Sequence, residues 1–332
     1  MNEKVVRRVL GFACLCFAPL LLAGIHSGAE SPGSYRVVHG WPVLPEGYVL
    51  GEVSGVAVDS HNHVFVFHRG SRPWMDDQIP QPIAQPVIVC FDGDSGKQIA
   101  AWGQNRFLRP HGLRVDSQDN VWVTDVALHQ VFKFSHDGNL LLTIGAARTP
   151  GLDGAHFNKP TDVAIASDGT IYVSDGYGNN RVARFSADGK FIGEWGQKGP
   201  KLGEFDLPHG ITLDSQGRIY VADRSNGRIQ VIGREGKFLY AWQSPEMGRP
   251  FAVTVGPDGY FYVVDGGDQN PEPPDHGAVL RLDLTGKILD RWSRHGNYDG
   301  QICVGHDIAV GKDGSVYVGD IQGKRVQKFV RK

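Results

Sequence analysis

Three histidines of this 332-residue chain stand at the same place in a recurring phrase. His111, His209 and His306 each open a short apolar segment, which is followed by a turn built on Asp, Asn or Gly and by a second segment of alternating aromatic and β-branched residues. Three imidazoles with an open fourth position form the ligand set of a catalytic zinc ion. Calcium suits such a triad poorly because it prefers oxygen ligands. The three positions therefore predict a zinc centre, provided that the fold brings them together.

The phrase occurs six times, which indicates six copies of one structural unit. The copies begin at Ser54, His111, Thr161, His209, Phe251 and His306. In several copies two more apolar segments follow and are joined by a turn that carries Asp-Gly, as in VFKFSHDGNLLLTIG. Four antiparallel strands per repeat are typical of a propeller blade. Because no helical periodicity is sustained, the sequence predicts an all-β, six-bladed β-propeller over residues 34–332.

The last copy ends at Lys332 without a fourth strand. We expect residues near Tyr35 to His39 (SYRVVHG) to supply it. The N-terminal strand would then close the ring and leave no open sheet edge.

The three histidines fall on blades two, four and six. Alternate blades of a six-fold ring are related by about 120°, so three side chains that point from them toward the axis can meet at one point. For any one of these histidines alone, a hydrogen bond to a backbone carbonyl would be a sufficient explanation. Their alternation favours metal binding instead.

Three more residues are expected at the same mouth of the propeller. Within a blade the first two strands are antiparallel, so the end of the second lies beside the start of the first. This places Arg69, Tyr177 and Arg224 around the histidines. A zinc ion flanked by two guanidinium groups and a phenol suits an anionic substrate that carries a hydroxyl or carbonyl oxygen. Each arginine by itself could equally form a salt bridge at the rim.

An aspartate recurs at the end of the second strand in five copies, where a structural role in the turn is expected. These residues are Asp125, Asp175, Asp223, Asp265 and Asp320. His68 takes this place in the first copy, and its role stays open between function and accommodation.

The first 29 residues have the layout of a secretory signal. Lys4, Arg7 and Arg8 precede an apolar run from Val9 to Ala23, and small residues follow. The run is short for a membrane span of about 20 residues, so we expect an exported protein, secreted or periplasmic, with a retained membrane anchor as the alternative. The formal net charge of -2 gives no indication of a nucleic-acid partner.

Two cysteines, Cys90 and Cys303, remain once the signal segment is excluded. Export would permit a disulfide between them. Two buried free thiols are at least as compatible with the sequence.

Several phrases of the chain together resemble one family. They are SGVAVD with FHRG, RPHGL, WVTDVALHQVFKF, KPTDVAI with VSDGYGNNR, LPHG with VADRSNGRIQ, and GHDIAV with VYVGD. In this order they are similar to the peptidyl-α-hydroxyglycine α-amidating lyases, propeller enzymes that complete C-terminal peptide amidation in animals. The resemblance covers essentially the whole chain after the signal segment.

The resemblance implies specific roles for the residues at the mouth. It implies zinc on the three histidines, Tyr177 as general base, Arg69 as its electrostatic partner and Arg224 as a further active-site arginine. The implied substrate is a small molecule or peptide that ends in an α-hydroxyglycine unit, and the implied products are an amide and glyoxylate.

The resemblance also implies a structural calcium ion. Its ligands would be the carbonyl oxygens of Val56 and Leu113 and the carboxylate of Asp307. The chain departs from the animal family at two disulfide positions, where it has Gly178 and Tyr220. We expect no adjoining hydroxylating monooxygenase, and this expectation leaves the physiological substrate open.

Two other functions are compatible with the sequence. One is a metal-dependent hydrolase or lactonase on the same scaffold, acting on another small carboxylate. The other is a non-catalytic NHL module that binds a partner through its rim loops. The module does not account for three histidines on alternate blades.

Overall fold

The computed structural model describes residues 33–74, 81–267 and 277–332, which belong to one compact unit from Pro32 to Lys332. The expected signal segment lies outside these ranges and stays a prediction. Helical structure within them is limited to two 3₁₀ turns, Arg224–Asn226 and Pro245–Met247. Over the same ranges, no helix has the length and apolarity that a membrane crossing requires.

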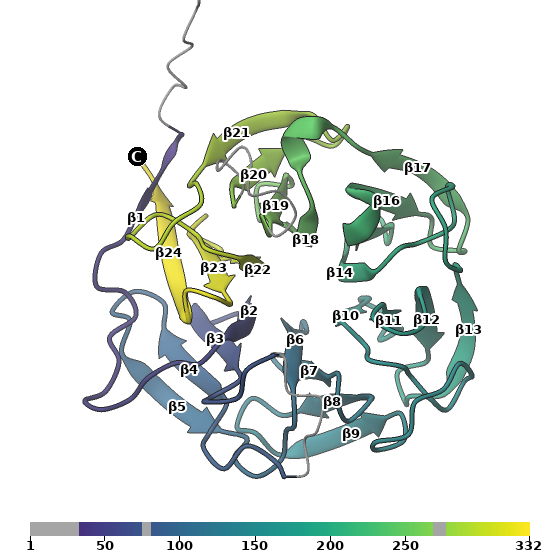
Figure 1. The fold of residues 1–332 in the computed structure, drawn as a ribbon, viewed down its shortest axis with the longest axis horizontal. Coiled ribbons are helices and arrows are strands. Elements are labelled where there is room, and N and C mark those ends of the chain that lie inside the picture. Colours follow the sequence, from purple (N-terminus) through teal and green to yellow (C-terminus); the bar gives the residue numbers. More distant parts are fainter. Residues whose placement is uncertain (1–32, 75–80, 268–276) are drawn as a thin grey trace, which may run out of the picture. The chain divides into compact units, whose positions relative to one another are not determined.

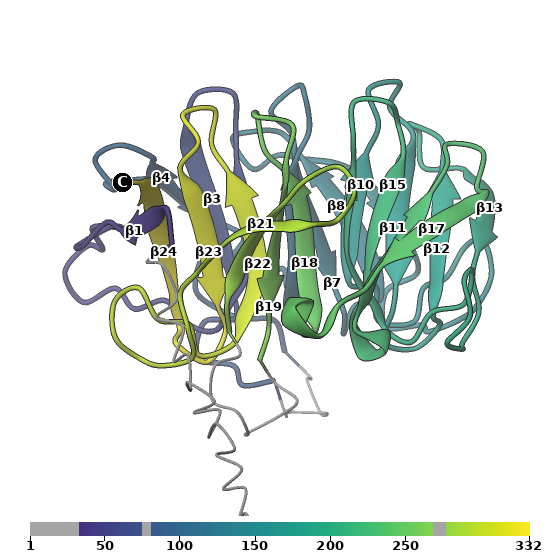
Figure 2. The same cartoon turned by 90° about the horizontal axis from the view of Figure 1, so that it is seen from above.

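Six four-stranded antiparallel sheets surround a common centre as the blades of a propeller, which confirms the predicted architecture (Figure 1). The first strand of each blade is innermost and the fourth is outermost. Seen from the side, the strands run between the two faces of the ring (Figure 2). The first three blades contain β2 (Val53–Val58), β3 (His63–His68), β4 (Ile88–Asp92) and β5 (Gln98–Trp102); β6 (Pro110–Val115), β7 (Val121–Asp125), β8 (Gln130–Phe134) and β9 (Leu140–Ile144); and β10 (Asp162–Ile165), β11 (Ile171–Asp175), β12 (Arg181–Phe185) and β13 (Phe191–Trp195).

The second half of the ring repeats this plan. Its strands are β14 (Pro208–Leu213), β15 (Ile219–Asp223), β16 (Arg228–Ile232) and β17 (Phe238–Trp242); β18 (Pro250–Val255), β19 (Phe261–Asp265), β20 (Val279–Leu282) and β21 (Ile288–Trp292); and β22 (Gly305–Val310), β23 (Val316–Asp320) and β24 (Arg325–Arg331).

The sixth blade receives its fourth strand from the N-terminal part of the unit. The strand β1 (Tyr35–Val37) pairs antiparallel with β24, and Tyr35 lies opposite Arg331. The Tyr35 ring also stacks on Trp292 of blade five, with 4.2 Å between ring centroids. The expectation that the N-terminal strand closes the ring is therefore confirmed.

The hydrophobic core lies between the blades. Each of six clusters joins two neighbouring sheets, and in one of them Phe65 and Phe67 of blade one pack with Val121 and Val123 of blade two. Because both faces of the middle strands are covered in this way, strands such as β7 are buried along their whole length. The packing fixes each inner strand, and with it the residues that face the axis.

Candidate metal centre and active-site mouth

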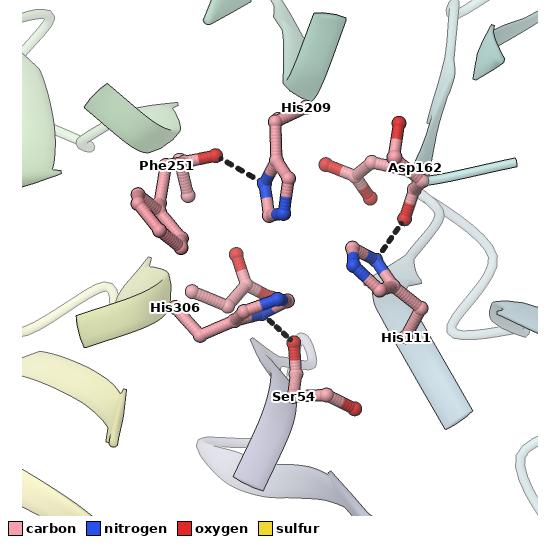
Figure 3. Close-up of a pocket in the computed structure, with 11 residues that line it drawn as sticks. Ser54, His111, Asp162, His209, Phe251 and His306 are labelled. Carbon is pink, nitrogen blue, oxygen red and sulfur yellow. Dashed lines mark hydrogen bonds between the residues drawn. The ribbon is translucent and has the colours of Figure 1, made fainter. Parts of the chain in front are cut away.

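The three histidines meet at the axis of the propeller (Figure 3). They come from the inner strands β6, β14 and β22, and they are almost completely buried. The three pairs of imidazole ring centroids are 4.5, 4.7 and 4.8 Å apart. One ligand nitrogen of each histidine lies within 4.8 Å of the other two. The fold therefore brings His111, His209 and His306 together as the blade alternation predicts.

A local irregularity of the inner strands aims the histidines at the axis. In β6 and β14 the pairing register with the second strand shifts between the proline before the histidine and the third residue after that proline. In β22 it shifts between Gly305 and Asp307. Such β-bulges bend a strand and re-aim one side chain. The same position is thus turned inward in all three blades.

Each imidazole is oriented by the next blade of the ring. Nδ1 of His111 lies 2.6 Å from the Thr161 carbonyl oxygen, and Nδ1 of His306 lies 2.7 Å from that of Ser54. A Cβ at Gly112 would lie only 2.7 Å from the same Thr161 oxygen, so a side chain there would push the neighbouring blade away. In blade two, Gly112 therefore lets the neighbouring blade come close enough to accept the bond.

His209 is held in the same way, with Nδ1 2.7 Å from the Phe251 carbonyl oxygen. A Cβ at Gly210 would lie 2.8 Å from that oxygen. Since a carbonyl oxygen only accepts, Nδ1 of all three histidines carries the proton and Nε2 presents a lone pair.

The converging lone pairs fit a metal cation. Burial lowers the pKa of all three imidazoles well below the ordinary value, so they are neutral near pH 7. Nε2 of His306 is buried and has no hydrogen-bond partner among the described residues. Buried acceptors that face one another need a donor or a cation. Three neutral imidazoles, each with the other nitrogen bonded to a carbonyl, are a well-formed ligand set for a transition metal.

Tyr177 reaches the same point from the end of the second strand of blade three. Its hydroxyl lies 3.1 Å from Nε2 of His111 and 3.3 Å from Nε2 of His209. One hydroxyl proton cannot satisfy both lone pairs at once. The phenol therefore stands beside the candidate metal position, where it can exchange a proton with a group bound there.

Arg224 lies on the other side of this phenol. Its Nη1 is 3.5 Å from the Tyr177 hydroxyl. Its guanidinium carbon is 3.7 Å from the centroid of the Phe251 ring. The arginine therefore contributes a positive charge next to both the phenol and the histidines, as expected from the sequence.

Arg69 is anchored more firmly than the sequence indicates. It is buried, with Nη1 2.6 Å from Oε2 of Glu52 and Nε 3.0 Å from the Pro110 carbonyl oxygen. Burial lowers the pKa of Arg69, and the pairing with Glu52 opposes this shift. The guanidinium carbon lies 4.4 Å from the centroid of Trp74, whose ring is 5.1 Å from that of Tyr177. Trp74 thus packs against both Arg69 and Tyr177.

Two residues at the mouth, Trp74 and Arg109, were not predicted from the sequence. Trp74 follows blade one's second strand outside the recurring phrase, so periodicity gives no signal for it. Arg109 stands directly before the Pro-His pair of blade two, and its guanidinium carbon lies 5.0 Å from the centroid of Trp74. The sequence does contain a signal for Arg109. Blade four has the apolar Leu207 at the equivalent position, so the blade itself does not require a charged side chain there.

The residues implied for calcium do not fit that ion in this chain. Arg114 donates through Nη1 to the Leu113 carbonyl oxygen at 2.6 Å and to Oδ2 of Asp307 at 2.7 Å. Through Nη2 it donates to Oδ2 of Asp162 at 2.5 Å. Val56 contacts the same Asp307 oxygen through its backbone N–H. A guanidinium group therefore binds two of the three oxygen groups that a calcium ion would need, those of Leu113 and Asp307.

This group of charges is buried and carries one carboxylate more than it has cations. Although burial by itself lowers the pKa of Arg114, the charges of Asp162 and Asp307 outweigh it and raise that pKa. Burial raises the pKa of Asp162 to about 7, against the attraction of Arg114, and Asp307 adds to the rise. We call Arg114, Asp162 and Asp307 the axial charge layer.

The recurring aspartates hold backbone N–H groups, as the sequence predicts. Asp125, for example, accepts from the backbone nitrogens of Leu108 and Arg109. His68 does the same work in blade one, where its Nδ1 accepts from the nitrogens of Gly51 and Gly70 at 3.1 Å each. The open question about His68 is thereby answered in favour of the scaffold.

A second group with metal-ligating atoms belongs to the scaffold as well. Oδ2 of Asp59 lies 2.9 Å from both Nδ1 of His63 and Nε2 of His136. Asp116, at the same repeat position in blade two, accepts instead from the indole N–H of Trp122. Asp214 of blade four accepts from an arginine and a tyrosine. Because the position receives donors in each of these blades, no metal is needed to explain it.

The two cysteines of the described chain are buried and unbridged. Burial raises the pKa of the Cys90 thiol to about 12. Cys303 donates to Oδ1 of Asn297 at 2.7 Å. Of the two alternatives left by the sequence, the structure shows free thiols.

The blade pattern and the histidine centre together define the class of protein: an NHL-repeat propeller with a candidate metal centre at its axis. The family model of the NHL repeat matches residues 107–134, 157–185 and 205–232. The solved structure of a streptogramin B lyase shares the fold, with a TM-score of 0.59, 17% identity, and coverage of 90% of this chain and 98% of that one. At this identity the likeness concerns the fold alone.

The sequence relatives are more specific. The chain is 34% identical over 321 residues to peptidyl-α-hydroxyglycine α-amidating lyase 2 of Drosophila melanogaster, covering 89% of this chain and 75% of the relative. It is 40% identical over 304 residues to peptidyl-glycine α-amidating monooxygenase B of Xenopus laevis, covering 84% of this chain and 34% of the relative. It thus spans about a third of the length of the latter protein. The chain belongs to the peptidyl-α-hydroxyglycine α-amidating lyase family.

Proposed function

We propose that this protein is a zinc-dependent lyase that splits an α-hydroxyglycine derivative into an amide and glyoxylate. Membership of the lyase family supports the reaction class. The observation that carries the proposal is the convergence of three Nε2 lone pairs beside the hydroxyl of Tyr177. Three neutral imidazoles favour zinc over hard cations such as calcium or magnesium.

The residues of the mouth supply the proton transfers of this reaction. A zinc ion on the three histidines would polarise the substrate's α-hydroxyl and make its proton easier to remove. Tyr177, as phenolate, removes that proton, and the O–H electrons form the carbonyl of glyoxylate. The electrons of the C–N bond leave with nitrogen, to which Tyr177 returns the proton. The amide departs, and neither water nor a redox partner is consumed.

The arginines make the phenol a base and orient the substrate. A tyrosine ordinarily loses its proton near pH 10, so nearby positive charge is required for it to act near neutral pH. Arg224 supplies such a charge 3.5 Å from the hydroxyl. The same guanidinium can pair with the substrate's α-carboxylate. Arg69, which packs against Trp74, adds a second positive charge that acts on the Tyr177 phenol.

The setting of the reaction is also part of the proposal. We retain export directed by residues 1–29, with a small molecule or a peptide as the source of the α-hydroxyglycine unit. No nucleic-acid partner is invoked.

The test measures glyoxylate and benzamide released from N-benzoyl-α-hydroxyglycine. We expect Tyr177→Phe to keep its zinc and its fold while kcat/KM falls by about 10²-fold or more, the usual contribution of general acid–base catalysis. Tyr298→Phe is the matched control, because Tyr298 is 80% exposed. Benzoate in place of benzamide would identify a hydrolase and overturn the proposal. An unchanged rate in Tyr177→Phe would remove Tyr177 from the mechanism.

A further inference from the structure

Arg109 brings a buried, unmatched charge to the edge of the mouth. The residue is only 5% exposed. Its Nε and Nη2 atoms are buried and have no hydrogen-bond partner in the described part of the chain. Its guanidinium group packs on Trp74, which offers a ring face but no acceptor atom. A buried guanidinium without an acceptor is costly, so a fold retains one where something else supplies the acceptor.

The nearby carboxylate does not serve Arg109. Glu52 pairs with Arg69 at 2.6 Å. Arg69 packs on the same Trp74 ring, and the charge of Arg109 contributes to lowering the pKa of Arg69. Two guanidinium groups therefore share one ring and one carboxylate. Among the described residues, this corner of the mouth therefore has one more cation than carboxylate.

The construction of the blade does not require an arginine at this position. In the recurring phrase, Leu207 of blade four stands where Arg109 stands in blade two, and each precedes a Pro-His pair. Both inner strands have the same bulge and present their histidine in the same way. An apolar side chain therefore serves the scaffold there, and the charge of Arg109 needs a separate explanation.

We propose that Arg109 binds a second carboxylate of the substrate, located on its acyl side. This inference rests on the proposed function and narrows it to α-hydroxyglycine units whose acyl group is acidic, such as a glutaryl or glutamyl group. Trp74 contacts both groups, with its ring centroid 5.1 Å from that of Tyr177 and 5.0 Å from the Arg109 guanidinium carbon. Because both groups contact one aromatic ring, a carboxylate a few bonds from the reacting carbon can reach Arg109. The planar guanidinium suits bidentate pairing with it.

The experiment compares N-glutaryl-α-hydroxyglycine with N-pentanoyl-α-hydroxyglycine, which have acyl chains of equal length and differ by the terminal carboxylate. We expect the natural protein to favour the glutaryl substrate by about tenfold or more in kcat/KM, the range of a charge-assisted hydrogen bond. In Arg109→Leu, which copies blade four, the ratio should fall to about one. Arg109→Lys should restore part of it. Lys159→Leu, which removes an exposed cation at the equivalent position of blade three, should keep the ratio of the natural protein.

The outcomes separate this inference from the proposed function. A natural protein without preference, or an Arg109→Leu variant with an unchanged ratio, overturns the role of Arg109. If neither substrate releases glyoxylate, the proposed lyase activity fails, and calorimetric binding of glutarate and pentanoate to the purified protein decides about Arg109. Glutarate should then bind about tenfold more tightly to the natural protein than to Arg109→Leu, with little change for pentanoate. Equal binding of glutarate to both proteins overturns the inference.

Discussion

The three histidines and the two carboxylates of the axial charge layer line the same cavity. The two groups differ in the cation that suits them. At the centre, the lone pairs of three imidazoles converge, and no single cationic side chain of the described residues pairs with all three. In the layer, the guanidinium of Arg114 binds both carboxylates. A guanidinium has its donors fixed and no vacant position for a ligand, whereas a metal on three imidazoles keeps one open. The layer therefore joins blades two, three and six, whereas the centre is equipped for chemistry.

The largest effect is expected from removing the cation of the histidine centre. His209→Ala, or treatment with a strong chelator, should remove the metal and lower the lyase rate by more than about 10²-fold, because the loss of metal polarisation is worth several kcal/mol. Metal analysis and glyoxylate release measure the two effects. Zinc should restore the chelated protein, and calcium should not.

The matched control is His295→Ala. Its Nδ1 also lies near a backbone carbonyl oxygen, that of Cys303 at 3.0 Å, but it is outside the three-histidine group. Full metal content in His209→Ala would show that the centre does not hold the ion.

The next effect is expected in the axial charge layer. Arg114→Leu leaves two buried carboxylates without their cation, which should lower the free energy of unfolding by about 3–5 kcal/mol. Calcium should restore part of this loss in the variant, since the oxygens that Arg114 vacates suit a hard cation. Denaturant unfolding with and without calcium measures both changes.

Arg218→Leu provides the comparison for this variant. It breaks a half-buried ion pair with Asp214 and should cost about 1 kcal/mol or less. Strong stabilisation of the natural protein by calcium would contradict the assignment of Arg114 as the resident cation.

The smallest effect is expected from the pH dependence of the layer. Burial raises the pKa of Asp162 to about 7, whereas an unfolded aspartate titrates near pH 3.9. Between these values the folded protein binds a proton that the unfolded chain has released, so stability from this group is lost as the pH rises. From pH 5 to pH 6, the natural protein should lose about 1 kcal/mol relative to Asp162→Asn, the value of one bound proton over one pH unit. A constant difference between the two proteins would show that Arg114 balances both carboxylates.

Much of the fold could be predicted from the repeat. Six copies of one phrase fix the number of blades, and an incomplete last copy indicates closure by an outside strand. Equivalent positions then follow from the repeat without any coordinates. This is why the alternation of His111, His209 and His306 predicts their convergence, and why Tyr177 and Arg224 are placed correctly beside them.

The residues that were missed depart from the repeat or lie outside it. Arg114 stands at a position where the other blades have Ala or Thr. That departure is visible in the sequence, but its contact with carboxylates from blades three and six depends on distances across the axis. Trp74 follows a strand in a segment with no counterpart in other blades. Its packing against Arg69 and Tyr177 is therefore a property of tertiary structure alone.

The pairing of β1 with β24 has a consequence for the order in which the protein folds. The other ladders join strands that are consecutive in the chain, so each blade can form from local hairpins as it is synthesised. The pairing of Tyr35 with Arg331 instead joins the two ends of the ring and must wait for the last residues. Until then blade six exposes the backbone of an unpaired edge. Because β24 lies between β1 and β23, this final strand pairs with both ends of the ring and closes it in a single late step.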